Sequence, residues 1–277
     1  MRVFKSILDF YINSSIHVAL GAFALSWITL IQFDLVFDKN LLFFVFFAAV
    51  TGYNFVKYFG LVKFHHRGLA QWLKTIQIFS VFCFIAMVYY GYRLEFKTLI
   101  YIAAFGVITF LYAVPIIPKK IFLDEQKNLR SISGLKVYVI AIIWTGVTVF
   151  LPILNSDYNM TSDVVIVAFQ RFVFVLVVML PFEIRDLNYD SLKLATIPQK
   201  IGVRNTKVLG SLLVLPFYFL NYLRDNVSSS LLIGSAIIAL VLFLFLVYSK
   251  QHQNKYYSAF WVESLPVIWL VILLIVC

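Results

Sequence analysis

Apolar residues along this chain gather in long runs that short polar segments separate. Each run has about 16–22 residues, close to the roughly 20 that a helix needs to cross the hydrocarbon core of a bilayer. No linker or second domain interrupts the series, so we expect a single membrane-embedded domain over residues 1–277. The pattern predicts about nine transmembrane helices, at residues 12–33, 40–60, 73–92, 97–114, 137–154, 163–182, 207–223, 229–248 and 257–276.

The composition supports a membrane class. Hydrophobic residues make up 62% of the chain and charged residues 13%, whereas soluble domains average about 45–50% and about 25%. A helix satisfies its backbone polar groups internally, which hydrocarbon requires. A transmembrane barrel would show segments of about ten residues with alternating polarity, and these runs do not alternate. We therefore expect an all-α fold, a polytopic membrane helical bundle.

Lysine and arginine are spread unevenly over the segments between the runs. With the N-terminus in the cytoplasm, eighteen of the 23 basic residues fall on cytoplasmic segments and four on outer ones. Cytoplasmic loops carry such an excess, so we expect a cytoplasmic N-terminus and an active face on that side of the cell membrane (the inner membrane of a bacterium). The net charge of +10 does not indicate a nucleic-acid partner, because it is distributed over short loops between hydrophobic runs.

Acidic residues cluster where the sixth run ends. Of the thirteen acidic residues in the chain, Glu183, Asp186 and Asp190 fall within eight positions. On a helix, residues three or four apart share a face, and carboxylates so close repel one another unless a cation lies among them. Mg²⁺ suits such a place, since it binds one or two carboxylates together with waters and substrate phosphates, and Arg185 could hold phosphate oxygens. The alternative is an ordinary solvated loop of mixed charge.

This region resembles a known family. The run from Glu183 to Asp190, followed by Thr196-Ile-Pro-Gln-Lys-Ile-Gly202, is similar to the second aspartate-rich signature of the UbiA family of membrane prenyltransferases. In that family a D-x-x-x-D element leads into a T-x-P-x-x-x-G segment, and Asp186 and Asp190 match its two aspartates. The stretch Tyr112-Ala-Val-Pro115, which leads to Lys119 and Lys120, also resembles the family's turn after its fourth helix.

The resemblance implies an activity and a set of partners. A prenyl group would move from a polyprenyl diphosphate to a hydrophobic, aromatic acceptor within the membrane, with Mg²⁺ as cofactor. Asp186 and Asp190 would hold the metal with help from Glu183. The diphosphate would be bound by Arg185, Lys119 and Lys120, and by Asn54 and Lys57 on the opposite wall.

The chain departs from the family at the first signature, N-D-x-x-D-x-x-x-D, near the end of the second run. Asn54 fits, but Phe55, Tyr58 and Val62 occupy the aspartate positions, and residues 39–94 contain no Asp or Glu. Three readings remain open: an enzyme in which cations such as Lys57 replace one metal, an inactive isoprenoid-binding protein, and an unrelated small-molecule transporter.

Arg171 and His17 are among the polar residues that lie inside the predicted spans. Arg171 lies in the middle of the sixth run, where a charge is costly and faces a cavity or a partner. We expect it either to contact the substrate or its diphosphate, or to form a buried tie to backbone carbonyls or another helix. We expect His17, in the first run, to form an interhelical hydrogen bond.

Overall fold

The computed structural model describes residues 2–58, 71–113, 134–187, 195–225 and 227–276. Every regular element in these ranges is a helix. In chain order they are α1 (Arg2–Asn13), α2 (Ile16–Gln32), α3 (Lys39–Tyr58), α4 (Gln71–Gly91), α5 (Phe96–Ala113), α6 (Lys136–Thr145), η4 (Gly146–Phe150), α7 (Leu151–Asn155), α8 (Ser162–Asp186), α9 (Ile197–Phe219), η6 (Leu220–Leu223), α10 (Ser229–Tyr248), η7 (Tyr257–Val262) and α11 (Leu265–Val276).

The predicted spans all fall on these helices. Seven helical segments of the described chain are long and apolar enough to cross a membrane, and the bent pair Lys5–Asn13 and Ile16–Gln32 makes an eighth. A further apolar helix, Phe96–Phe110, is shorter. The prediction of an all-α, polytopic membrane bundle is therefore confirmed. The total of nine spans and the cytoplasmic N-terminus stay predictions.

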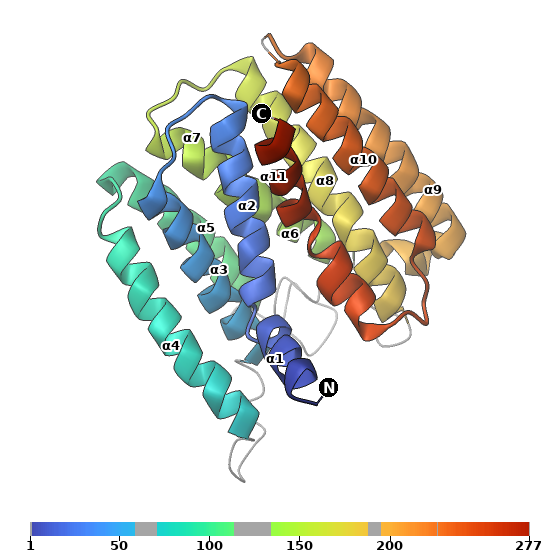
Figure 1. Ribbon diagram of the computed structural model, residues 1–277, viewed down its shortest axis with the longest axis horizontal. Coiled ribbons are helices and arrows are strands. Elements are labelled where there is room, and N and C mark those ends of the chain that lie inside the picture. The colour runs from blue at the N-terminus through green and yellow to red at the C-terminus, as the bar shows by residue number, and fades with distance from the viewer. Residues whose placement is uncertain (1, 59–70, 114–133, 188–194, 226, 277) are drawn as a thin grey trace, which may run out of the picture.

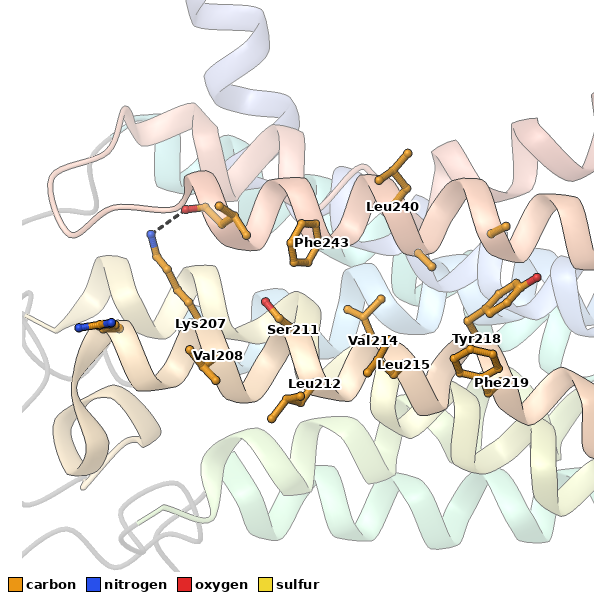
Figure 2. Close-up of a pocket in the computed structure, with 14 residues that line it drawn as sticks. Lys207, Val208, Ser211, Leu212, Val214, Leu215, Tyr218, Phe219, Leu240 and Phe243 are labelled. Carbon is orange, nitrogen blue, oxygen red and sulfur yellow. Dashed lines mark hydrogen bonds between the residues drawn. The ribbon is translucent and has the colours of Figure 1, made fainter.

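Helix α8 forms the centre of the bundle, with α9 and α10 on one side and α2 to α5 on the other (Figure 1). It buries 72% of its most apolar window, whereas α4 at the edge buries 17%. Its core contacts include an aromatic cluster in which Phe174, Phe217 and Trp269 lie with ring centroids 5.1–5.5 Å apart. An open groove runs between α9 and α10 on their outer face (Figure 2).

The first predicted span is broken. Helices α1 and α2 meet at an angle of 58°, and Ser15 at the break has φ 62°, a left-handed conformation that few residues other than glycine adopt. Ser14 and Ser15 are both fully buried. Such a conformation persists only where surrounding contacts hold it, and here α3 supplies those contacts.

Helix α9 begins ten residues before the predicted span because the T-x-P-x-x-x-G segment is itself helical. Pro198 lies in the first turn, where a missing N–H costs nothing. Gly202 has φ 77° and interrupts the helix. A side chain at that φ would be strained, which explains the glycine at the end of the segment.

Candidate functional site

The end of α8 carries the predicted acidic cluster, and its members separate into different roles. The Glu183 side chain is buried, and its Oε2 accepts a hydrogen bond from the backbone N–H of Ile197 at 3.2 Å. A carboxylate at a helix N-terminus satisfies an orphan donor and complements the helix dipole. Glu183 thus ties the end of α8 to the start of α9. The prediction that it also assists a metal is not tested by this contact.

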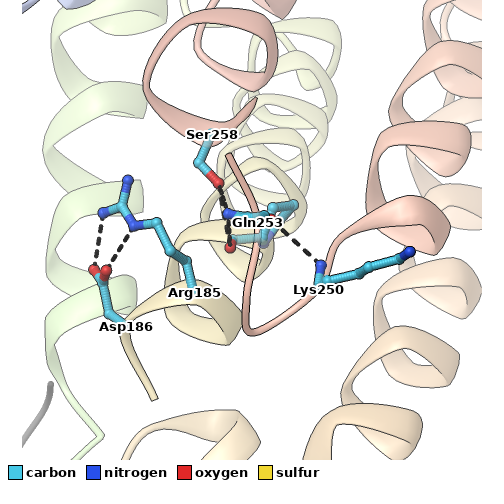
Figure 3. A network of polar contacts seen from close by, with 6 residues as sticks. Arg185, Asp186, Lys250, Gln253 and Ser258 are labelled. Carbon is cyan, nitrogen blue, oxygen red and sulfur yellow. Dashed lines mark hydrogen bonds and ion pairs between the residues drawn. The ribbon is translucent and has the colours of Figure 1, made fainter. Parts of the chain in front are cut away.

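Asp186 and Arg185 form a bidentate ion pair (Figure 3). Arg185 Nε donates to Asp186 Oδ1 at 2.7 Å, and Nη2 donates to Oδ2 at 3.1 Å. The Asp186 side chain is 25% exposed, so it points neither into bulk solvent nor into the core. The pair is partly buried, and together its two members would offer a ligand one group of each sign.

The turn that supports this pair is fixed from the other side of the bundle. Gln253 Nε2 donates to the Pro181 carbonyl at 3.3 Å, and Ser258 Oγ donates to the same oxygen at 3.4 Å (Figure 3). Gln253 and Ser258 also hydrogen-bond each other. These contacts join Gln253, in the connection after α10, and Ser258, in η7, to the end of α8 that carries Arg185.

On α3, Asn54 and Lys57 reach the break between α1 and α2. Asn54 is buried, its Oδ1 accepts from Ser15 Oγ at 2.8 Å, and its Nδ2 donates to Ser14 O and Ser80 Oγ at 3.0 and 2.8 Å. Lys57 Nζ donates to Ser15 Oγ at 2.9 Å, and its side chain is otherwise exposed. An ammonium has three donors, so Lys57 keeps donors for a ligand, whereas the amide of Asn54 is fully engaged.

Glu263 is a candidate site residue that the sequence reasoning missed. It follows the π-helical turn η7, a form that often marks functional sites. Its carboxylate lies within electrostatic reach of Lys57 and Arg185. Within the described chain this carboxylate accepts no hydrogen bond. The sequence did contain a signal for Glu263, because an acidic residue inside an apolar run is costly and indicates a functional site by default.

The site therefore joins three helices that are distant in sequence. Lys57 comes from α3, Arg185 and Asp186 from α8, and Glu263 from the start of the last span. Two cations and two carboxylates converge at one end of the bundle. The cations suit phosphate oxygens, and the carboxylates suit a metal ion or a proton.

Other predicted site residues lie outside the described ranges. These are Asp190, Lys119 and Lys120. Among the residues that are described, no group of three or more His, Cys, Asp or Glu side chains could hold a metal. The Mg²⁺ prediction thus depends on Asp186 together with Asp190.

The two intramembrane residues have structural partners. Arg171 is 1% exposed, and its guanidinium donates to Leu25 O at 2.7 Å and to Thr148 Oγ1 at 3.1 Å. It also lies over the Trp269 ring. Of the two roles considered for Arg171, the structure favours a tie between helices. His17 bonds the Phe260 carbonyl through Nε2 at 2.8 Å, so the expected interhelical hydrogen bond is confirmed.

These features define a class: an integral, polytopic helical membrane protein with a charged site at one end of its bundle. A solved structure of digeranylgeranylglyceryl phosphate synthase, a UbiA-family membrane prenyltransferase, has the same fold. The TM-score is 0.56 at 17% identity, over 99% of this chain and 98% of the other. No family model and no curated protein sequence matches the chain. The resemblance to the UbiA family is thereby confirmed at the level of the fold.

Proposed function

We propose that this chain is a UbiA-like intramembrane prenyltransferase, which moves a prenyl group from a polyprenyl diphosphate to a lipophilic, aromatic acceptor. The strongest support is that the fold and the site agree. The fold is shared with a membrane prenyltransferase over nearly the whole chain, and Arg185, Asp186 and Lys57 converge at the end of the bundle that carries the family-like motif. Fold alone does not imply function, so the chemistry of the site carries the proposal.

In the proposed reaction the bond between the prenyl carbon and the diphosphate oxygen breaks, and the electron pair leaves with the diphosphate. Arg185 and Lys57 bind the departing diphosphate from opposite walls, together with Lys119 and Lys120. Donors placed where negative charge develops lower the barrier because they need no reorganisation. The acceptor then bonds to the prenyl carbon and loses a proton, and the apolar bundle excludes water from the cation.

The donor set fits a single Mg²⁺, because this ion is usually bound by one or two carboxylates plus substrate phosphates. Asp186 and Asp190 would hold it, with Glu183 adjacent. When bound, Mg²⁺ would neutralise charge on the diphosphate. On the α3 wall Lys57 supplies positive charge where the family has aspartates and metal, and Glu263 opposite balances Lys57 and Arg185 until the substrate binds. We assign the site to the cytoplasmic face on the basis of the basic-residue asymmetry.

The test is a transfer assay on the purified protein in membranes, with labelled farnesyl and longer polyprenyl diphosphates, Mg²⁺ and a lipid extract as the source of acceptor. Asp186→Asn should lower product formation by about a hundredfold. Asp163→Asn is the matched control, because Asp163 lies in the first turn of the same helix at the opposite end, and it should leave the rate unchanged. Equal rates in the two variants would refute the site.

A second function is favoured by one observation. Arg185 already neutralises Asp186, and the groups of the described α3 that bond to the chain around the break are an amide, an ammonium and the Tyr58 hydroxyl. A protein that binds an isoprenoid diphosphate without turnover needs no more than these groups. It would be stabilised against thermal unfolding by polyprenyl diphosphate, lose that effect in Arg185→Met, and yield no product with any acceptor.

A further inference from the structure

A groove of about 760 Å³ lies between α9 and α10 on the outside of the bundle (Figure 2). Its walls are almost entirely apolar, with Leu212, Leu215 and Phe219 from α9 and Leu240 and Phe243 from α10. This surface is separate from the candidate functional site, which lies between α3, α8 and the last span. In a membrane, such a groove faces lipid.

The hollow has a cause in the sequence. Ser211 on α9 and Ala236 and Ala239 on α10 line the groove with small side chains. Behind them the helices pack closely, since a Cβ on Gly210 would lie 2.4 Å from a Leu246 methyl. Because the two helices pack closely on their inner side and carry small residues on their outer side, a groove is left along the helix pair.

The groove has the length of one bilayer leaflet. It extends along α9 from Arg204 to Phe219. At about 1.5 Å per residue this is roughly 22 Å, compared with about 20–22 Å for half of a bilayer of about 40–45 Å that includes its headgroup regions. A lipid whose headgroup lies at Arg204 and whose acyl chain lies along the groove would therefore end near the bilayer midplane.

One end of the groove is positively charged. Arg204 and Lys207 line it there, and Lys250 lies within electrostatic reach of Lys207. Lys207 Nζ donates one hydrogen bond, to the Val247 carbonyl at 2.7 Å (Figure 2), which leaves two donors for a ligand. Within the described chain none of these three cations forms an ion pair. These three cations lie at the level of the lipid headgroups, where they complement the charge of an anionic ligand.

We propose that the groove between α9 and α10 binds an anionic phospholipid, with one acyl chain along the groove and the phosphate at Arg204 and Lys207. The site lies at the same end of the bundle as Asp186, where the basic-residue excess predicts the cytoplasmic leaflet. Basic clusters at that level bind anionic headgroups. The proposal does not depend on the prenyl-transfer activity.

The experiment measures lipid binding to delipidated full-length protein by native mass spectrometry, with phosphatidylglycerol and phosphatidylcholine of the same chain length. The double variant Arg204→Gln/Lys207→Gln should weaken phosphatidylglycerol binding roughly thirtyfold and leave phosphatidylcholine binding unchanged. The control Lys5→Gln/Lys74→Gln removes two exposed cations outside the groove, and it should bind like the parent protein. Equal losses in both double variants would show general charge attraction and overturn the proposal.

A second variant tests the apolar part. Ala236→Phe fills the groove while all three cations remain, and it should weaken phosphatidylglycerol binding as well. Equal binding of the two lipids by the parent protein, or unchanged binding in Ala236→Phe, would mean that the groove holds no specific lipid. Prenyl transfer in the same preparations reports separately on the proposed function.

Discussion

Replacing Asn54 by alanine tests whether this residue stabilises the fold or contacts the diphosphate. The Asn54 side chain is 4% exposed and makes three hydrogen bonds, to Ser15, Ser14 and Ser80, at 2.8–3.0 Å. An interhelical hydrogen bond within a membrane contributes about 0.6 kcal/mol on average and at most about 1.7, so the three together contribute about 2–5 kcal/mol. They also hold Ser15 in its left-handed conformation, and with it the bend between α1 and α2.

We expect Asn54→Ala to lower the melting temperature by at least about 4 °C, since about 1 kcal/mol corresponds to about 2–4 °C in a chain of this size. The measurement is thermal unfolding in detergent with neither diphosphate nor Mg²⁺ present. Thr51→Ala is the control one turn away, because Thr51 Oγ1 donates only to the Phe47 carbonyl of its own helix at 2.8 Å. If Asn54→Ala melts like Thr51→Ala and yet loses diphosphate binding, Asn54 is a ligand contact and the reasoning here is wrong.

Three further substitutions test the contacts described above by the same unfolding measurement. Arg171→Lys should cost about 1–3 kcal/mol, because a single ammonium cannot reach the acceptors that the planar guanidinium binds; an unchanged melting temperature would contradict the interhelical tie. Glu183→Ala should cost about 1–2 kcal/mol without metal, because a backbone N–H at the start of α9 loses its acceptor; a loss seen only with Mg²⁺ would instead support the metal role. Gly146→Ala should cost about 1–3 kcal/mol, because its Cβ would lie 2.1 Å from the Phe105 ring. Gly106→Ala, where nothing lies within 4 Å, should cost nothing.

The sequence was sufficient to predict the fold class, for a physical reason. Membrane-spanning helices must be long, apolar and internally hydrogen-bonded, so each one leaves a run that can be counted directly. The break at Ser14 and Ser15 was not visible in this way, because it depends on hydrogen bonds from α3. The early start of α9 was missed because Lys200 and Arg204 make its first turns polar.

For the site, the sequence by itself determined the local part. The family-like motif predicted Asp186 and Arg185 as site residues, because they are neighbours in one short stretch of the sequence. It could not assign Glu183 its contact with α9, nor bring Lys57 and Glu263 to Arg185, since these residues are up to 206 positions apart. Such charges meet only when α3, α8 and the last span pack around the same end of the bundle. The tertiary structure alone decided that pairing, because the free energy of a charge depends on which neighbours surround it in space.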